Sequence, residues 1–143
     1  MPEREAKAIA KFLRMSPSKL KPVTDLVRGR DLNEALTILK FTPGKGSALV
    51  EKVVQSAAAN AENNHEMNVD ALYVAEINAN QGPTLKRYRA GAQGRASMIF
   101  KRTTHLNVVL REREDSKVKV ATDTAAKEVE TKEEGGSPDG SES

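Results

Sequence analysis

Apolar residues recur every three or four positions in the first half of the chain, which is the spacing of a buried helix face. The first run follows Ser16-Pro17, a pair that is typical of a helix start, and ends before Gly29. Asp31 and Glu34 have the spacing of a capping box and predict a second, short helix. The residues expected to be buried in these two helices are Leu20, Val23, Leu26, Val27, Ala35, Leu36, Ile38 and Leu39.

The longest predicted helix follows Thr42-Pro43, which repeats the start signal of the first helix. Residues 44–47 have the composition of a phosphate loop but lack its full spacing and a preceding buried strand, so we interpret them as a helix start. The apolar residues of this helix form one continuous stripe, whose alanines would let another element approach closely. The stripe consists of Val50, Val53, Val54, Ala57, Ala58 and Ala61.

Alternation of apolar and polar residues predicts strands elsewhere in the chain. Residues 6–15 form the first, and its candidates for burial are Ile9, Phe12, Leu13 and Met15. In a second run after Val69, the two sides are Leu72, Val74 and Glu76 against Tyr73, Ala75 and Ile77. In a third run the two sides are Leu106, Val108 and Leu110 against Asn107, Val109 and Arg111. We interpret the second and third runs as the feet of one antiparallel hairpin.

The charge is divided sharply along the chain. Residues 1–113 hold 19 Lys and Arg against 11 Asp and Glu, whereas residues 114–143 hold 4 Lys against 9 Asp and Glu. A basic body of this kind points to a nucleic acid or another polyanion as the partner. Residues 114–143 carry few apolar residues and predict an acidic, disordered tail. This tail either keeps the protein soluble or shields the basic body before a partner binds.

Several classes of protein and site are excluded or disfavoured by composition. The chain has no cysteine, so disulfides and thiolate metal sites are excluded, and its two histidines lie far apart in the sequence. No apolar run approaches the roughly 18 residues that span a bilayer, and the charged N-terminus leads into no long apolar run. We therefore expect a cytosolic protein with no secretory signal, no metal and no cofactor.

The segment between the two hairpin feet is basic throughout. Residues 80–102 contain six cations and no Asp or Glu: Lys86, Arg87, Arg89, Arg95, Lys101 and Arg102. A structureless loop of this length is rare in a compact domain, so we predict an extended hairpin whose arms of about ten residues reach roughly 30 Å. Gly91 and Gly94 permit the turn at its tip. A two-stranded ribbon is marginal in water alone, and these charges require a polyanion beside it.

RNA fits such a projecting ribbon better than a regular DNA duplex does. Arginine offers a planar fork to phosphates, and Tyr88 either stacks on an unpaired base or merely covers a strand pair. A second basic group near the N-terminus either binds RNA as well or is a solvated face. Its members are Lys7, Lys11, Arg14, Lys19, Lys21, Arg28 and Arg30. The helix start at Ser16 adds donors that suit a phosphate.

Spaced blocks of this sequence form a recognisable pattern. In the hairpin they are residues 82–87 (GPTLKR), 92–96 (AQGRA) and 101–109 (KRTTHLNVV). Upstream they are residues 15–19 (MSPSK), 26–29 (LVRG) and 56–61 (SAAANA). Together, over about residues 5–112, they resemble the ribosomal protein L22 family of bacteria and plastids. The family usually has Pro-Arg where this chain has Ala90-Gly91, so we expect one basic tip contact fewer and a more flexible tip.

The resemblance implies an α+β fold, with three helices packed on a small three-stranded antiparallel sheet. Residues 1–113 would form this domain, with a long protruding β-hairpin over residues 78–104, and residues 114–143 the disordered tail. The resemblance also implies a structural protein of the large ribosomal subunit that binds its rRNA and supports its assembly. The hairpin tip would lie at the wall of the nascent-peptide exit tunnel.

The resemblance and the basic pattern together name the expected contacts. The expected rRNA-binding residues are Arg14, Ser16, Lys19, Lys21, Arg28, Lys45, Lys86, Arg87, Arg95, Lys101, Arg102, Thr103 and His105. The expected tunnel-lining tip consists of Arg87, Tyr88, Arg89, Ala90, Gly91, Ala92 and Gln93. The expected partners are large-subunit rRNA, neighbouring ribosomal proteins and the nascent polypeptide, with no membrane. The expected location is the ribosome of the cytoplasm, or of a plastid if the protein is organellar.

Two competing functions stay open on the residues alone. A free RNA or DNA chaperone would use the same basic ribbon on many partners, although anchoring at two feet favours a single fitted site. An enzyme acting on a phosphorylated substrate would need a convergent acid, base or nucleophile set. The sequence shows none, so we expect no enzymatic activity.

Overall fold

A computed structural model describes residues 4–113 of the chain. The predicted disordered tail, residues 114–143, lies outside the described residues. The helices and strands, in chain order, are β1 (Glu5–Leu13), α1 (Pro17–Val27), α2 (Leu32–Phe41), α3 (Lys45–His65), β2 (Leu72–Gln81), β3 (Leu85–Ala90), β4 (Ala96–Lys101) and β5 (Thr104–Glu112). Among these residues, no helix is both long and apolar enough to cross a bilayer.

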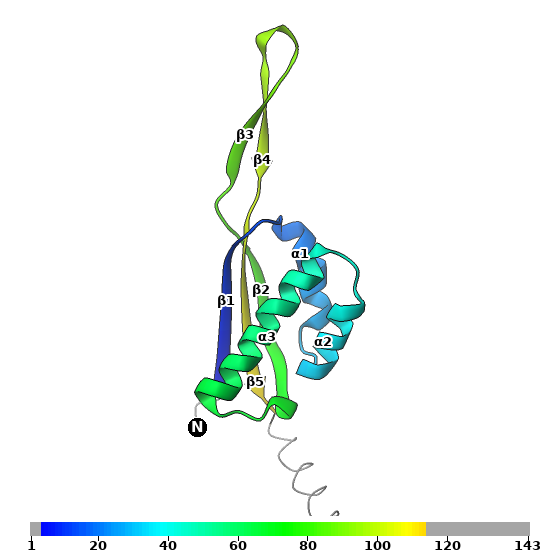
Figure 1. Cartoon of the computed structure of the whole chain (residues 1–143), viewed down its shortest axis with the longest axis vertical. Helices are drawn as coiled ribbons and strands as arrows, with labels where there is room; N and C mark the ends of the chain where they lie inside the picture. Colours follow the sequence, from blue (N-terminus) through cyan, green and yellow to red (C-terminus); the bar gives the residue numbers. More distant parts are fainter. Residues whose placement is uncertain (1–3, 114–143) are drawn as a thin grey trace, which may run out of the picture. The chain divides into compact units, whose positions relative to one another are not determined.

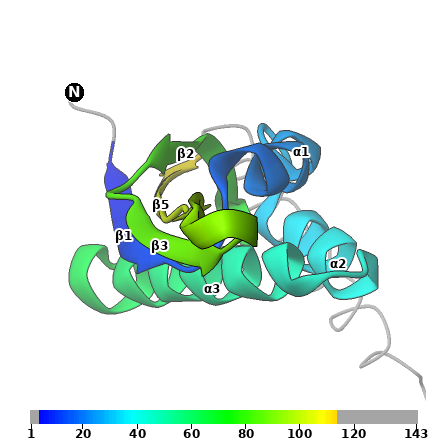
Figure 2. The ribbon, with the colours of Figure 1, turned by 90° about the horizontal axis from the view of Figure 1, so that it is seen from above.

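The strands form two antiparallel sheets. In the larger one, β5 lies between β1 and β2 and pairs with both. In the smaller one, β3 and β4 pair only with each other and extend away from the helices (Figure 1). Seen along the ribbon, the larger sheet curves around the core, with α3 beside β1 and β5, and α1 beside β2 (Figure 2). The predicted α+β fold with a protruding hairpin is confirmed.

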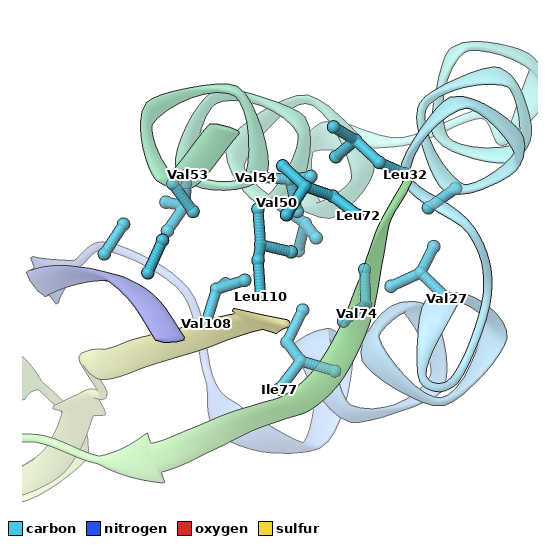
Figure 3. Packing of buried hydrophobic residues seen from close by; sticks show 14 of the residues in the cluster. Val27, Leu32, Val50, Val53, Val54, Leu72, Val74, Ile77, Val108 and Leu110 are labelled. Carbon is cyan, nitrogen blue, oxygen red and sulfur yellow. The ribbon is translucent and has the colours of Figure 1, made fainter. Parts of the chain in front are cut away.

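The core fills the space between the three helices and the inner face of the larger sheet (Figure 3). Leu106, Val108 and Leu110, which were predicted to share one side of a strand, are completely buried on β5. The stripe on α3 is also buried, apart from the partly buried Ala58. Short side chains on both α3 and β1 let this helix lie close to the strand, as the alanine pattern predicted.

The predicted burial of Ile9 and Phe12 on β1 is wrong, because both side chains are about 60% exposed, at 61% and 59%. Alternation along the strand turns Ala6 and Ala8 toward α3, so Ile9 points to the opposite face of the sheet. Phe12 has a positive φ of 59° where the register of β1 and β5 shifts, and its ring meets His105 edge-on. Leu13 and Met15, the other two candidates, are partly buried against the core.

Two further predicted faces are corrected by the structure. On α1, Leu26 is 49% exposed and Thr24 is buried instead, because Leu20, Thr24 and Val27 share one helix face. On β2, the register shifts after Val74, and the irregularity exchanges the sides predicted for Glu76 and Ile77. Glu76 therefore faces solvent, while Ile77 enters the core.

The helix starts lie near the predicted positions but use different contacts. Ser16 and Asp31 precede α1 and α2, yet neither side chain caps its helix. The capping box is wrong, since the carboxylate of Glu34 accepts a hydrogen bond from Arg30 at 2.8 Å. Thr42 follows the last residue of α2, so α3 does not begin directly after Thr42-Pro43. It begins at Lys45, inside residues 44–47, which were interpreted as a helix start.

We predict that Leu106→Ala lowers the free energy of unfolding by about 2–5 kcal/mol, because it leaves a cavity in the centre of the core. Leu26→Ala, at the half-exposed position on α1, is the matched control and should cost less than about 1 kcal/mol. Urea unfolding followed by circular dichroism measures both. Equal losses for the two variants would contradict this description of the core.

Candidate nucleic-acid interface

The predicted hairpin is present as an almost fully exposed ribbon. β3 and β4 pair from Leu85 opposite Lys101 to Ala90 opposite Ala96, beyond the last β2–β5 pair of Gln81 and Thr104. Leu85 alone among the residues of β3 and β4 is partly buried. The ribbon therefore continues from the larger sheet but is supported by it only at its root.

The root of the ribbon is a tightly packed joint. The Gly82 N–H donates to the Thr103 carbonyl at 2.9 Å, and the Thr103 hydroxyl donates to the Pro83 carbonyl at 2.5 Å. A Cβ on Gly82 would lie 2.6 Å from the Thr103 hydroxyl oxygen, so the two arms can approach this closely only with glycine here. The neighbouring Thr104 hydroxyl donates to the Met15 carbonyl at 2.6 Å, which ties the root to the segment before α1.

Two of the predicted RNA contacts belong to this joint. Thr103 is only 3% exposed, and its hydroxyl is used within the root. Nδ1 of the partly buried His105 accepts a hydrogen bond from the Phe12 N–H at 3.1 Å. Both residues therefore help to build the root, and their contact with RNA stays a prediction.

The two faces of the ribbon differ in chemistry. Residues that pair directly across two antiparallel strands point to the same side. One side, which we call the cationic face, carries Leu85, Arg87, Arg89, Ser97, Ile99 and Lys101. The other side, which we call the aromatic face, carries Lys86, Tyr88, Ala90, Ala96, Met98 and Phe100. The three large apolar side chains of the aromatic face are 43–69% exposed.

The tip is a tight turn over Ala92–Gly94. As predicted, Gly94 permits this turn, because it has a positive φ of 70°, and the preceding Gln93 has one of 57°. Gly91 has extended backbone instead, and its N–H donates to the Arg95 carbonyl at 2.7 Å. A Cβ there would lie 3.0 Å from that carbonyl oxygen, so Gly91 permits close approach of the two strands. The predicted tunnel-lining residues 87–93 are all exposed.

A concave hollow of about 560 Å³ lies beside the root of the ribbon. We call it the root hollow, and its lining residues are Arg14, Met15, Ser16, Lys19, Lys45, Phe100, Lys101 and Arg102. Six of these are predicted rRNA-binding residues, and they come from three separate segments of the chain. The structure thus joins part of the N-terminal basic group to the hairpin cations.

The starts of α1 and α3 bring these cations together. A Cβ on Gly46, in the first turn of α3, would lie 3.3 Å from Sδ of Met15 and 3.4 Å from Cδ2 of Leu20. This close packing holds Ser16 and Lys45 at one hollow. Helix N-termini carry unpaired N–H groups and a partial positive charge, which adds to the positive potential of the side chains.

The N-terminal basic group divides into paired and unpaired cations. Lys7 lies 3.1 Å from Glu5, and with Arg111 it holds the pKa of the Glu5 carboxyl below its usual value. Arg28 contacts Asp25 at 2.9 Å and also donates to the Ile77 carbonyl, while Arg30 contacts Glu34 at 2.8 Å. These three cations are therefore occupied, at least in part, within the body of the protein.

Among the cations of residues 4–113 that have no carboxylate at ion-pair distance, ten were predicted to bind rRNA or to line the tunnel. They are Arg14, Lys19, Lys21, Lys45, Lys86, Arg87, Arg89, Arg95, Lys101 and Arg102. Lys21 lies on α1, outside the lining of the root hollow, and the rest line the hollow or lie on the hairpin. Of the predicted rRNA-binding residues, Arg28 alone pairs with an acid in this part of the chain.

The comparison with known families decides the relationship. The model of the family described as "Ribosomal protein L22p/L17e" matches residues 8–111. The chain belongs to this family. Members of the L22p/L17e family are structural proteins of the large ribosomal subunit and are not enzymes.

Curated members of the L22p/L17e family are similar over nearly their whole length. The chain is 59% identical to the large ribosomal subunit protein uL22 of Clostridium tetani over 110 residues, which is 77% of this chain and 99% of that protein. It is 57% identical to uL22 of Clostridioides difficile over 109 residues, 76% of this chain and 98% of that protein. It is 53% identical to uL22 of Halothermothrix orenii over 111 residues, 78% of this chain and 98% of that protein.

Sequence reasoning missed one residue of the root hollow in this L22p/L17e member. Phe100 lines the root hollow and is 50% exposed. The guanidinium carbon of Arg102 lies 5.7 Å from the centroid of its ring. The alternation of the second arm, counted back from the tip, would have placed Phe100 on the same face as Tyr88. That count needs the position of the turn, which the glycines alone left open between Gly91 and Gly94.

We predict that Gly82→Ala destabilises the protein by about 1–3 kcal/mol, because its Cβ would collide with the Thr103 hydroxyl. Removing that hydroxyl in Gly82→Ala/Thr103→Ala should relieve part of the collision. The loss of unfolding free energy in the double variant should then be smaller than the sum of the losses in Gly82→Ala and Thr103→Ala, by at least about 0.5 kcal/mol. Chemical denaturation of all four proteins measures this coupling, and strictly additive losses would show that the two residues are not in steric contact.

Proposed function

We propose that this chain binds large-subunit rRNA through one continuous basic surface, made of the root hollow and the hairpin. The observation that carries this proposal is the gathering of cations without acidic partners from three segments of the chain. Phosphates are the natural counter-charges for such cations, and arginine can bind a phosphate through two hydrogen bonds. Membership of a family of large-subunit proteins supports large-subunit rRNA as this partner.

The exposed ribbon itself supports a large, fitted partner. Two strands that pair only with each other are marginally stable in water, and this ribbon also exposes Tyr88, Met98 and Phe100. A surface that buries both faces would offset these costs. Folded RNA can do so, because its phosphates suit the cationic face while unpaired bases suit the aromatic face.

The hairpin tip then reaches furthest into the subunit. We propose that residues 87–93 line the wall of the nascent-peptide exit tunnel, where they meet the growing polypeptide. The body would stay near the subunit surface, beside neighbouring ribosomal proteins. It would support assembly by holding in place the RNA that contacts the root of the ribbon. This function belongs to the ribosome of the cytoplasm.

Replacing all six hairpin cations with alanine should lower the dependence of RNA binding on salt. At about 0.7 per phosphate contact, the slope of log affinity against log salt should fall by about 4. Binding to large-subunit rRNA at several salt concentrations measures this slope. Lys40→Ala/Lys52→Ala removes two exposed cations outside the interface and is the control. An unchanged slope in the six-fold variant would show that these charges do not face phosphates.

Sedimentation of a cell lysate through a sucrose gradient tests the proposed location. The protein should travel with the large subunit and stay bound through a wash with moderate salt, because many contacts would have to break together. A protein found only at the top of the gradient would contradict the proposal. A protein distributed over many RNA-containing fractions would instead favour a free RNA chaperone.

A further inference from the structure

We propose that the root hollow is a pocket for a single unstacked nucleotide of RNA. In this arrangement, the base lies against Phe100 and Arg102 while its flanking phosphates lie on Lys19 and Lys45. This inference rests on the proposed function and adds to it, because it specifies which conformation of the RNA the root hollow binds.

The size and lining of the hollow suit one nucleotide. Its volume of about 560 Å³ lies within the roughly 300–1,000 Å³ that is usual for pockets that hold small ligands. Lysine and arginine side chains make up five of the eight lining residues, and no acidic residue lines it. A ligand that fills this space must therefore carry negative charge.

Phosphate alone leaves Phe100 unexplained. The chain has only three phenylalanines and no tryptophan, yet this ring is half-exposed in the wall of a cationic hollow. An exposed aromatic ring among cations is an expected platform for a nucleic-acid base, since every base has an apolar face that stacks. The Arg102 guanidinium lies over this ring, 5.7 Å from its centroid, and bases also stack on arginine.

A base pair inside an RNA helix cannot use this platform. In an RNA helix the faces of the bases are already covered by their neighbours, whereas bases in loops and bulges can be splayed out. The lysines at the starts of α1 and α3 line the same hollow as Phe100 and provide positive charge for the backbone of the same nucleotide. The geometry therefore favours a bulged or looped nucleotide over a regular helix.

The test compares full-length variants for binding to transcribed large-subunit rRNA over a range of salt concentrations. Phe100→Ala should raise Kd about tenfold without changing the salt slope, since stacking carries no charge. Phe100→Trp, which keeps an aromatic ring at this position, should bind with a Kd close to that of the parent protein. Lys19→Ala/Lys45→Ala should lower the slope by about 1.4, at about 0.7 per contact. Phe41→Ala, which removes the 84% exposed ring of α2, should leave both quantities unchanged.

A second readout identifies the nucleotide. A photoreactive p-azidophenylalanine at position 100, in assembled large subunits, should crosslink to one unpaired rRNA nucleotide, and the same group at position 41 should not. Adenosine monophosphate alone should not compete at micromolar concentration, because it lacks the second flanking phosphate. Competition at that concentration would overturn the assignment to a nucleotide within RNA.

The outcomes separate the two proposals. If Phe100→Ala binds as the parent does, or if its crosslinks fall on paired nucleotides or on protein, the pocket is overturned while rRNA binding stands. A loss of affinity that Phe100→Trp does not rescue would also overturn it, since that loss would not come from stacking. If the parent itself fails to bind large-subunit rRNA, the proposed function is overturned.

Discussion

Strand β5 makes hydrogen bonds along both edges, and the rest of the structure depends on that double pairing. Its inner side carries the centre of the core, and its N-terminal end continues into the root of the ribbon. The core therefore sets the position of the hairpin through one continuous backbone. A two-stranded ribbon could not hold a defined direction by itself, because it has no core of its own.

The joint at the root connects the stable core to the root hollow and the ribbon. Gly82 and Thr103 bring the two arms of the ribbon together, and Thr104 fastens the neighbouring backbone to Met15. Because α3 also packs on Met15, cations from three segments come to line one hollow. Like charges held close together repel one another. Their convergence without acidic partners is therefore a cost to the free protein that a polyanion relieves.

The ribbon presents two kinds of chemistry on opposite sides. Alternation along paired strands separates Arg87, Arg89 and Lys101 from Tyr88, Met98 and Phe100. A ribbon that lies within folded RNA can then meet phosphates on one side and bases on the other. The two kinds of contact differ in their response to salt, because only the first releases counterions.

The sequence by itself determined the helices, the strands and the hairpin of this protein, because each depends on local spacing of apolar residues, glycines and prolines. It also indicated the cations of the ribbon and of the root hollow as a candidate interface, since charge without acidic neighbours can be recognised from the sequence alone. Only the tertiary structure decided which face each strand buries, because irregularities near Phe12 and after Val74 change the alternation. The root hollow was equally hidden from the sequence, because Ser16, Lys45 and Phe100 meet only when α1, α3 and the ribbon pack together.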